Sequence, residues 1–297
     1  MKKPELTIGV SFYNTSGTLI DLARCIFAQT FTDWEWILID DGSTDGGCDL
    51  ISRIEDPRVQ VICEKVNRGR SYRYNYITRI ARGDFIARFD ADDLCHPMKF
   101  QKQVEFLRAH PHVDVVSTGM LCLGPGDVPL GRRTPKAITH EAICSRPLTG
   151  FGIVHGSIMG RSEWFRKHPY PEQWQFAVDY ALYISSYYKS CFANIPDPLY
   201  FYREYATHSL GKYYRTNIAV SQAIKQYAPP VLNSAQKLRT RLARYFRICA
   251  YILATALGQQ RRLISRRSPE VLSEEDLKEF GAAMKLIKAT KIPGIDS

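Results

Sequence analysis

Signatures of several common protein classes are absent from this 297-residue sequence. No G-x-G-x-x-G turn follows the first apolar run and no Walker A loop occurs, so a dinucleotide-binding Rossmann protein and a P-loop NTPase are disfavoured. The lack of a G-x-S-x-G elbow and of an H-E-x-x-H pair disfavours a serine hydrolase and a zincin. The residues from Asp41 imitate an EF-hand loop, but its twelfth position is Ser52, where calcium needs a bidentate glutamate.

Long apolar runs and cysteine motifs are also missing. No run of about 18 apolar residues occurs, so no membrane-spanning helix is expected. The opening "MKKPELTIGVSFYN" has too short an apolar stretch for a signal peptide and is interpreted as a strand. The 8 cysteines stand singly, without C-x-x-C or zinc-site spacing. Reduced thiols in a cytoplasmic protein are therefore predicted.

The net positive charge of the chain lies almost entirely in its last third. Residues 1–214 carry 25 basic and 24 acidic side chains, whereas residues 215–297 carry 15 and 6. A uniformly basic protein would indicate nucleic-acid binding, which is not expected here. A basic tail on a nearly neutral body indicates a docking segment beside a site with another function.

The first 120 residues alternate between apolar, strand-length runs and amphipathic, helix-length stretches. Strands are predicted at residues 6–13, 34–40, 59–63, 84–90 and 113–118, with helices from about residues 17, 46, 70 and 97. Near-continuous valine, isoleucine and phenylalanine indicate strands buried on both faces, as in βαβ units. The fold class is therefore α/β, with a mostly parallel sheet flanked by helices.

The remainder of the chain is less regular. A Gly/Pro-rich loop is expected at residues 124–133, one or two short strands at 150–160, a helix within 175–189 and a strand at 198–205. After about residue 208 the pattern is helical. We divide the chain at residues 1–120, 121–210 and 211–297, the last being a basic helical extension.

Chemically reactive side chains follow each of the first four strands. The strand ends carry, in order, an aromatic, two acids, a basic loop and the "DADD" cluster beginning at Asp90. In a parallel sheet all four would meet at one edge, where ligands of such folds bind. Asp90 and Asp92 are hard oxygen ligands that suit Mg²⁺ or Mn²⁺ together with substrate phosphates. A metal there would stabilise a departing diphosphate.

Five segments resemble, in order and spacing, the motifs of the inverting family 2 glycosyltransferases with the GT-A fold. They are "VSFYN", "WEWILIDDGSTDGG", "NRGRSYRYN", "GDFIARFDADDLCHPMKFQKQ" and "FAVDYALYISS", within residues 6–205. The resemblance implies a nucleotide-sugar donor, most often a UDP-sugar, and a divalent metal, Mn²⁺ or Mg²⁺. The bacterial relatives it points to build surface polysaccharides.

The resemblance also implies roles for single residues. Asp92 would bind the metal, and Asp90 would serve the ribose or a metal-bound water. The remaining donor-binding candidates, for the base, ribose and diphosphate, are Ser11, Phe12, Tyr13, Asp41, Arg70, Arg73 and Ala91. Asp40, Ser43 and Asp45 are open between site roles and bracing of the turn or helix, and Asp93 is open between a site role and a partner for the next helix dipole.

An inverting transfer needs a base that takes the proton from the acceptor hydroxyl. The resemblance assigns this role to Asp179, although many members have Glu-Asp where this chain has Val178-Asp179. His155 is a looser candidate, facing the acceptor or serving as a core histidine. Arg203 and His208 are open between reaching the diphosphate or metal and lying on the surface.

The basic tail allows several partners. Residues 248–257 are apolar with Arg and Lys on both flanks, which suits a helix lying on an anionic membrane. The alternatives are packing on its own domain or on a second subunit. The prediction is a cytoplasmic or peripheral-membrane, metal-dependent glycosyltransferase that acts on a glycan or lipid-linked acceptor. The competing hypotheses are a sugar-phosphate nucleotidyltransferase and a non-catalytic polyanion- or membrane-binding module.

Overall fold

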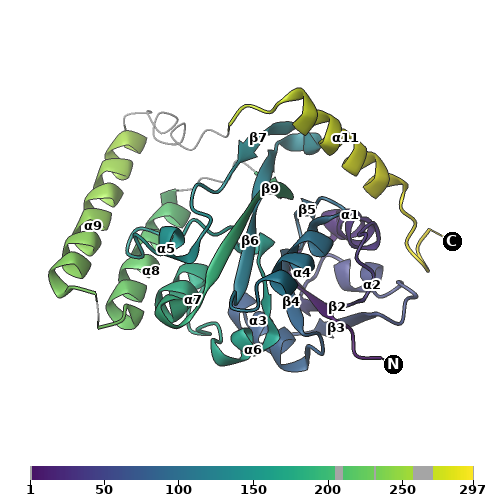
Figure 1. Ribbon diagram of the computed structural model, residues 1–297, viewed down its shortest axis with the longest axis horizontal. Coiled ribbons are helices and arrows are strands. Elements are labelled where there is room, and N and C mark those ends of the chain that lie inside the picture. Colours follow the sequence, from purple (N-terminus) through teal and green to yellow (C-terminus); the bar gives the residue numbers. More distant parts are fainter. Residues whose placement is uncertain (1, 205–209, 231, 257–269, 297) are drawn as a thin grey trace.

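One mixed sheet runs through the whole molecule (Figure 1). The computed structural model describes residues 2–204, 210–230, 232–256 and 270–296. The strand order within them is β3-β2-β1-β4-β8-β6-β9-β5, and β7 pairs with β6. Helices cover both faces of this sheet, so the predicted α/β class is confirmed.

The first half of the sheet is parallel. It contains β1 (Leu6–Phe12), β2 (Trp34–Asp41), β3 (Val59–Glu64) and β4 (Phe85–Asp90). The helices between these strands are α1 (Ser16–Phe27), α2 (Gly47–Ile51) and α3 (Arg70–Ile80). Every residue of β2 is buried, as the unbroken apolar run predicts for a strand covered on both faces.

The second half of the sheet adds antiparallel neighbours. It contains β5 (Leu94–Cys95), β6 (Val115–Leu123), β7 (Pro129–Arg133), β8 (Met159–Arg161) and β9 (Phe192–Arg203). β8 runs antiparallel to both β4 and β6, and β9 runs parallel to β6. Residues 124–133 were expected to form a loop, but β7 pairs with β6 and makes part of this segment a hairpin.

Short helices connect these strands. They are α4 (Lys99–Ala109), α5 (His140–Ile143), α6 (Ser162–Lys167) and α7 (Val178–Ser186), with single 3₁₀ turns η1 (Pro125–Asp127), η2 (His155–Ser157) and η3 (Tyr187–Lys189). The aromatic side chains of α7 lie in a second core with α8, Trp164 and Phe192. The aromatic run from Tyr180 is therefore core, apart from the exposed Tyr188.

In the described segments, three longer helices follow the sheet. α8 (Leu210–Tyr227) packs on α7, and α9 (Ser234–Ala256) packs on α8 as the outermost layer (Figure 1). α11 (Glu274–Ala289) instead returns to α1, where Phe280, Met284 and Ile287 join the core of the parallel half. No helix in the described part of the chain is long and apolar enough to span a bilayer.

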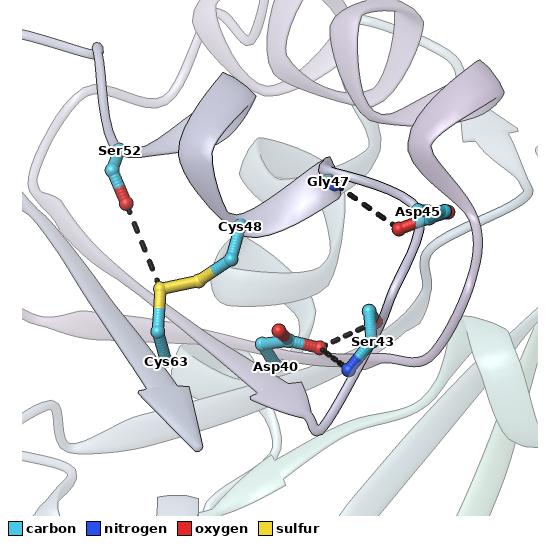
Figure 2. Close-up of a disulfide and its surroundings, with 7 residues drawn as sticks. All are labelled: Asp40, Ser43, Asp45, Gly47, Cys48, Ser52 and Cys63. Carbon is cyan, nitrogen blue, oxygen red and sulfur yellow. Dashed lines mark hydrogen bonds between the residues drawn. A yellow bond between two sulfur atoms is a disulfide. The ribbon is translucent and has the colours of Figure 1, made fainter. Parts of the chain in front are cut away.

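A disulfide joins Cys48 of α2 to Cys63 of β3 (Figure 2). The prediction that all thiols are reduced is wrong for this pair. The two cysteines are 15 residues apart in sequence, and α2 folds back along β3 to bring their Cα atoms within 6.0 Å. That separation matches none of the short metal or redox motifs, so only the fold reveals the pair. The other six cysteines, all in described segments, are free.

Lys99 is fully buried at the start of α4. Its ammonium lies near the rings of Phe89 and Phe100 and has no hydrogen-bond partner in the described residues. Burial lowers the pKa of Lys99 to about 8, although the nearby Cys95 and Cys25 thiols oppose the shift. The folded state therefore releases the Lys99 proton above about pH 8, whereas the unfolded chain holds it up to about pH 10.5.

We predict that Lys99→Met stabilises the protein at neutral pH and not at alkaline pH. Between pH 8 and 10.5 the unfolded state binds more protons, so the free energy of unfolding of the parent rises across this window. The variant should gain up to about 3 kcal/mol at pH 7 and almost nothing near pH 10.5. Urea unfolding at both pH values checks this, with the partly exposed Lys102→Met as the control. An equal gain at both pH values would refute the assignment.

Candidate active site

The carboxyl ends of the parallel strands meet at one edge of the sheet. Ser11 of β1 pairs in register with Asp90 of β4, and Phe12 pairs with Asp40 of β2. The Phe12 side chain is buried in the core and turned away from a ligand at this edge, whereas 49% of the Tyr13 surface is exposed. Ala91 is buried, and its carbonyl accepts a hydrogen bond from Thr18 Oγ1 at 2.8 Å.

Asp41 and Arg73 form a buried ion pair beneath this edge. One carboxylate oxygen of Asp41 accepts from Arg73 Nε at 2.6 Å and from the Arg68 amide at 2.8 Å, and the other accepts from the Gly69 amide at 2.9 Å. Arg73 is 0% exposed and also donates to the Val66 carbonyl. The pair thus holds the "NRGR" loop against β2, and the full burial of Arg73 keeps its guanidinium away from a diphosphate at the surface.

The "DGSTD" turn is braced by its own side chains (Figure 2). Asp40 accepts from the backbone amide and the hydroxyl of Ser43. Asp45 accepts from the Ser16 amide at 2.7 Å, and this bond lowers the pKa of Asp45 against the opposing effect of burial. For Asp40, Ser43 and Asp45 the observed contacts are those of turn bracing.

The three aspartates after β4 repel one another. Burial raises the pKa of Asp92, the Asp90 charge raises it further, and the charges of Arg203 and Arg70 oppose both effects. Burial, followed by the charges of Asp90 and Asp92, raises the pKa of Asp93 well above its ordinary value. Asp93 is only 1% exposed and accepts from Tyr200 Oη at 2.6 Å and from the Arg203 amide at 2.8 Å, so it braces the loop from below.

Arg203 ties this acidic loop to the second half of the sheet. Its guanidinium donates to both carboxylate oxygens of Asp127, at 2.7 and 2.9 Å, and to Asp21 at 2.9 Å. It also donates to the Asp92 carbonyl at 3.3 Å. Arg203 is 6% exposed, so its surface alternative is excluded in this conformation. His208, the other candidate from this segment, lies outside the described residues.

A buried aromatic group lies next to Asp90. Tyr74 of α3 donates to Asp90 at 3.2 Å, and its ring lies 5.0 Å from that of Tyr170. The Tyr170 hydroxyl is 2.8 Å from His155 Nε2. Burial lowers the pKa of His155, while the charges of Asp179 and Asp90 oppose that shift. His155 therefore lies close enough to both carboxylates to sense their charge.

Sequence reasoning missed Tyr74 and Tyr170. Tyr74 stands four residues after Arg70, which places it on the same face of α3, and that spacing was a usable signal. Tyr170 follows no motif, and only the fold reveals it. Both rings also pack around the buried guanidinium of Arg88, at 4.9 and 5.4 Å from its centre.

Asp179 stands on the first turn of α7. The preceding Ala177 has a left-handed backbone, with φ of 52°, which turns the chain sharply into the helix. The Asp179 charge raises the pKa of Tyr170 and of Tyr183, adding in each case to the larger effect of burial. Its carboxylate accepts no hydrogen bond from the described residues, which leaves it free for a ligand.

Arg70 is an exposed cation at this edge, as is the neighbouring Arg68. Arg70 is the first residue of α3, and its charge acts on Asp92, Tyr74 and His155. It forms no ion pair with a described residue. Of the three arginines in the "NRGRSYR" motif, Arg73 is held by Asp41, Arg68 donates to the Tyr72 hydroxyl, and Arg70 remains free to bind an anion.

Residues 7–168 match the family model described as Glycosyl transferase family 2. The chain belongs to glycosyltransferase family 2. Over 166 residues it is 34% identical to the putative glycosyltransferase EpsE of Bacillus subtilis, covering 55% of this chain and 58% of that protein. The chain thus spans somewhat more than half the length of this curated relative.

Solved structures share the architecture. One is Staphylococcus aureus TarS 1–349 in complex with UDP-GlcNAc, with a TM-score of 0.63 at 17% identity over 97% of this chain and 82% of that one. Another is mannosyltransferase PcManGT of Pyrobaculum calidifontis, in complex with GDP-Man and Mn²⁺, with a TM-score of 0.59 at 18% identity over 98% and 86%. The predicted GT-A fold is therefore confirmed.

Proposed function

We propose that this glycosyltransferase moves a sugar, with inversion, from a UDP-sugar to a hydroxyl of a glycan or lipid-linked acceptor, using a divalent metal. The observation that carries the proposal is a cluster in which the ring of Tyr74, which donates a hydrogen bond to Asp90, lies 5.7 Å from the His155 ring. The charges of Asp179 and Asp90 both oppose the lowering of the His155 pKa by burial. One carboxylate group for the donor and one for the acceptor are thus near the same imidazole. The family assignment favours glycosyl transfer over a nucleotidyltransferase or a non-catalytic binding module.

The residues after β4 fit a divalent cation. In the described segments no group of three His, Cys, Asp or Glu side chains forms a complete metal site. Mg²⁺ and Mn²⁺ are often bound by one or two carboxylates plus substrate phosphates, and Asp92 with Asp90 matches that donor set. A bound cation would relieve the mutual repulsion of these acids and act as a Lewis acid on the departing diphosphate.

This chain's own residues would position the donor and deprotonate the acceptor. Arg70, free and at the amino end of α3, would contact the diphosphate. Ser11, Tyr13 and the "DGSTD" turn lie at the edge where the nucleoside would bind, with Asp41 bracing the loop beside it. Asp179, without a hydrogen bond from the described residues, would accept the proton of the attacking hydroxyl.

Asp92→Asn should weaken metal-dependent donor binding. The amide removes the charge that attracts the cation, so the affinity for UDP in the presence of Mn²⁺ should fall at least ~10-fold, with little change when EDTA is present. Calorimetry under both conditions measures this. Asp84→Asn, an exposed aspartate before β4, is the control. Equal Mn²⁺-dependent affinity in the parent and the Asp92 variant would exclude a metal role for Asp92.

Asp179→Asn should leave donor binding near normal and reduce transfer by ~10²–10⁴-fold, the usual contribution of a general base. Calorimetry with UDP and acceptor-dependent UDP release separate the two effects. Glu141→Gln, an acid on the first turn of α5, is a matched control for a helix-dipole role. Full turnover by the Asp179 variant would remove it from the mechanism.

We also propose that α9 lies on an anionic membrane surface. Arg244, Ile248 and Tyr251 face inward, whereas the opposite stripe is apolar and exposed. Its members are Leu238, Leu242, Tyr245, Phe246, Ile252 and Leu253, with exposed fractions between 42% and 74%. Arg239 and Arg247 border the stripe, and α9 contains no acidic residue. A helix with this pattern suits a headgroup interface, where each basic residue adds about 1 kcal/mol.

Phe246→Asp/Leu253→Asp should abolish binding to vesicles that contain anionic phosphatidylglycerol. Co-flotation of the parent should occur with these vesicles, weaken as salt rises, and be absent with pure phosphatidylcholine. Leu286→Asp, an exposed leucine of α11, should bind like the parent. No flotation by the parent, or a change from dimer to monomer in the α9 variant, would favour a second copy of the chain as the partner.

A further inference from the structure

A groove of about 470 Å³ lies between α8 and the segment that leads into α7. Trp174 and Phe176 contribute one wall. The other wall is one face of α8, lined at every fourth position from Tyr214. Gln222 and Gln226 are two of these residues. No residue proposed above for donor binding or proton transfer lines this groove.

One wall is fixed and polar groups on the other remain free. Gln173 and the Trp174 indole both donate to the Tyr227 hydroxyl, at 2.7 and 3.3 Å, which ties the loop to the end of α8. Gln222 and Gln226 are exposed, and their side-chain amides make no hydrogen bond to a described residue. The groove thus offers free amide donors and acceptors beside aromatic rings.

We propose that this groove is a subsite for a saccharide segment of the acceptor, behind the residue that receives the transferred sugar. Amide side chains present a donor and an acceptor together, which matches neighbouring hydroxyls of a sugar ring. Aromatic rings supply apolar area for the less polar faces of such rings. The inference rests on the proposed glycosyl transfer and names the class of acceptor that the second half of the chain recognises.

The groove is connected to the proposed reaction centre. Ser71, next to Arg70, donates to the Trp174 carbonyl at 3.4 Å, so the groove wall touches the first turn of α3. Phe176 is followed by the sharp turn at Ala177, and Asp179 comes two residues later. The segment that forms this wall of the groove therefore leads directly along the chain to the carboxylate proposed as the base.

The charge of the groove distinguishes its ligand from the donor. The strand edge is rich in aspartates that need a cation, whereas the lining of the groove includes no acid and one arginine. That residue, Arg215, lies 5.5 Å from the centre of the Phe176 ring. The combination favours a hydroxyl-rich chain over a metal-bound diphosphate, and Arg215 favours acidic over neutral saccharides.

Binding of the full chain to an array of neutral and acidic bacterial oligosaccharides tests the inference. The parent should bind a set of saccharides, and Tyr214→Ala/Gln222→Ala should weaken that binding ~10-fold or more. Both residues are exposed, so the variant is expected to fold. Lys225→Ala, exposed on α8 but not lining the groove, is the matched control and should bind like the parent.

Calorimetry with UDP and Mn²⁺ separates this inference from the proposed function. Unchanged UDP affinity in the groove variant, together with lost saccharide binding, supports a separate acceptor subsite. Saccharide binding that survives the double substitution, or a parent that binds UDP but no saccharide on the array, would overturn the subsite. A parent that binds saccharides but no UDP contradicts the proposed donor and leaves the groove supported.

Discussion

Repulsion among Asp90, Asp92 and Asp93 is the constraint on which the rest of the structure depends. Three carboxylates within four residues, partly removed from water, require compensation by hydrogen bonds or positive charge. Tyr200 and the Arg203 amide satisfy Asp93. The Arg203 guanidinium holds the Asp92 carbonyl and is itself held by Asp21 and Asp127. The acidic loop of the first half is thus stabilised by a strand of the second half.

This dependence explains the order of the sheet. β9 pairs with β5, the short strand directly after the aspartates, and with β6. Arg203 is the last residue of β9 and therefore lies where the acidic loop needs it. The parallel half of the sheet depends on the second half to hold its acidic loop in this shape. The strand order is thus linked to the electrostatics of the site.

The sequence was sufficient to predict the strands of the parallel half and the acidic residues at their ends, because βαβ alternation and strand ends follow from local periodicity. It was not sufficient for contacts between distant segments. Arg73 and Arg70 share one motif, and only the fold shows that Asp41 neutralises the first and leaves the second free. The Cys48–Cys63 disulfide depends in the same way on how α2 returns along β3.

The strand edge proposed for the donor and the groove proposed for the acceptor are held by different kinds of structure. This difference bears on specificity. The donor edge is held by strand register and by buried ion pairs, so a single substitution there disturbs several partners at once. On the α8 side of the groove, Tyr214, Gln222 and Gln226 are exposed. The shape and chemistry of the groove can change without disturbing the sheet. Acceptor choice is therefore expected to reside mainly in this groove, whereas the donor edge is constrained by the charges it must balance.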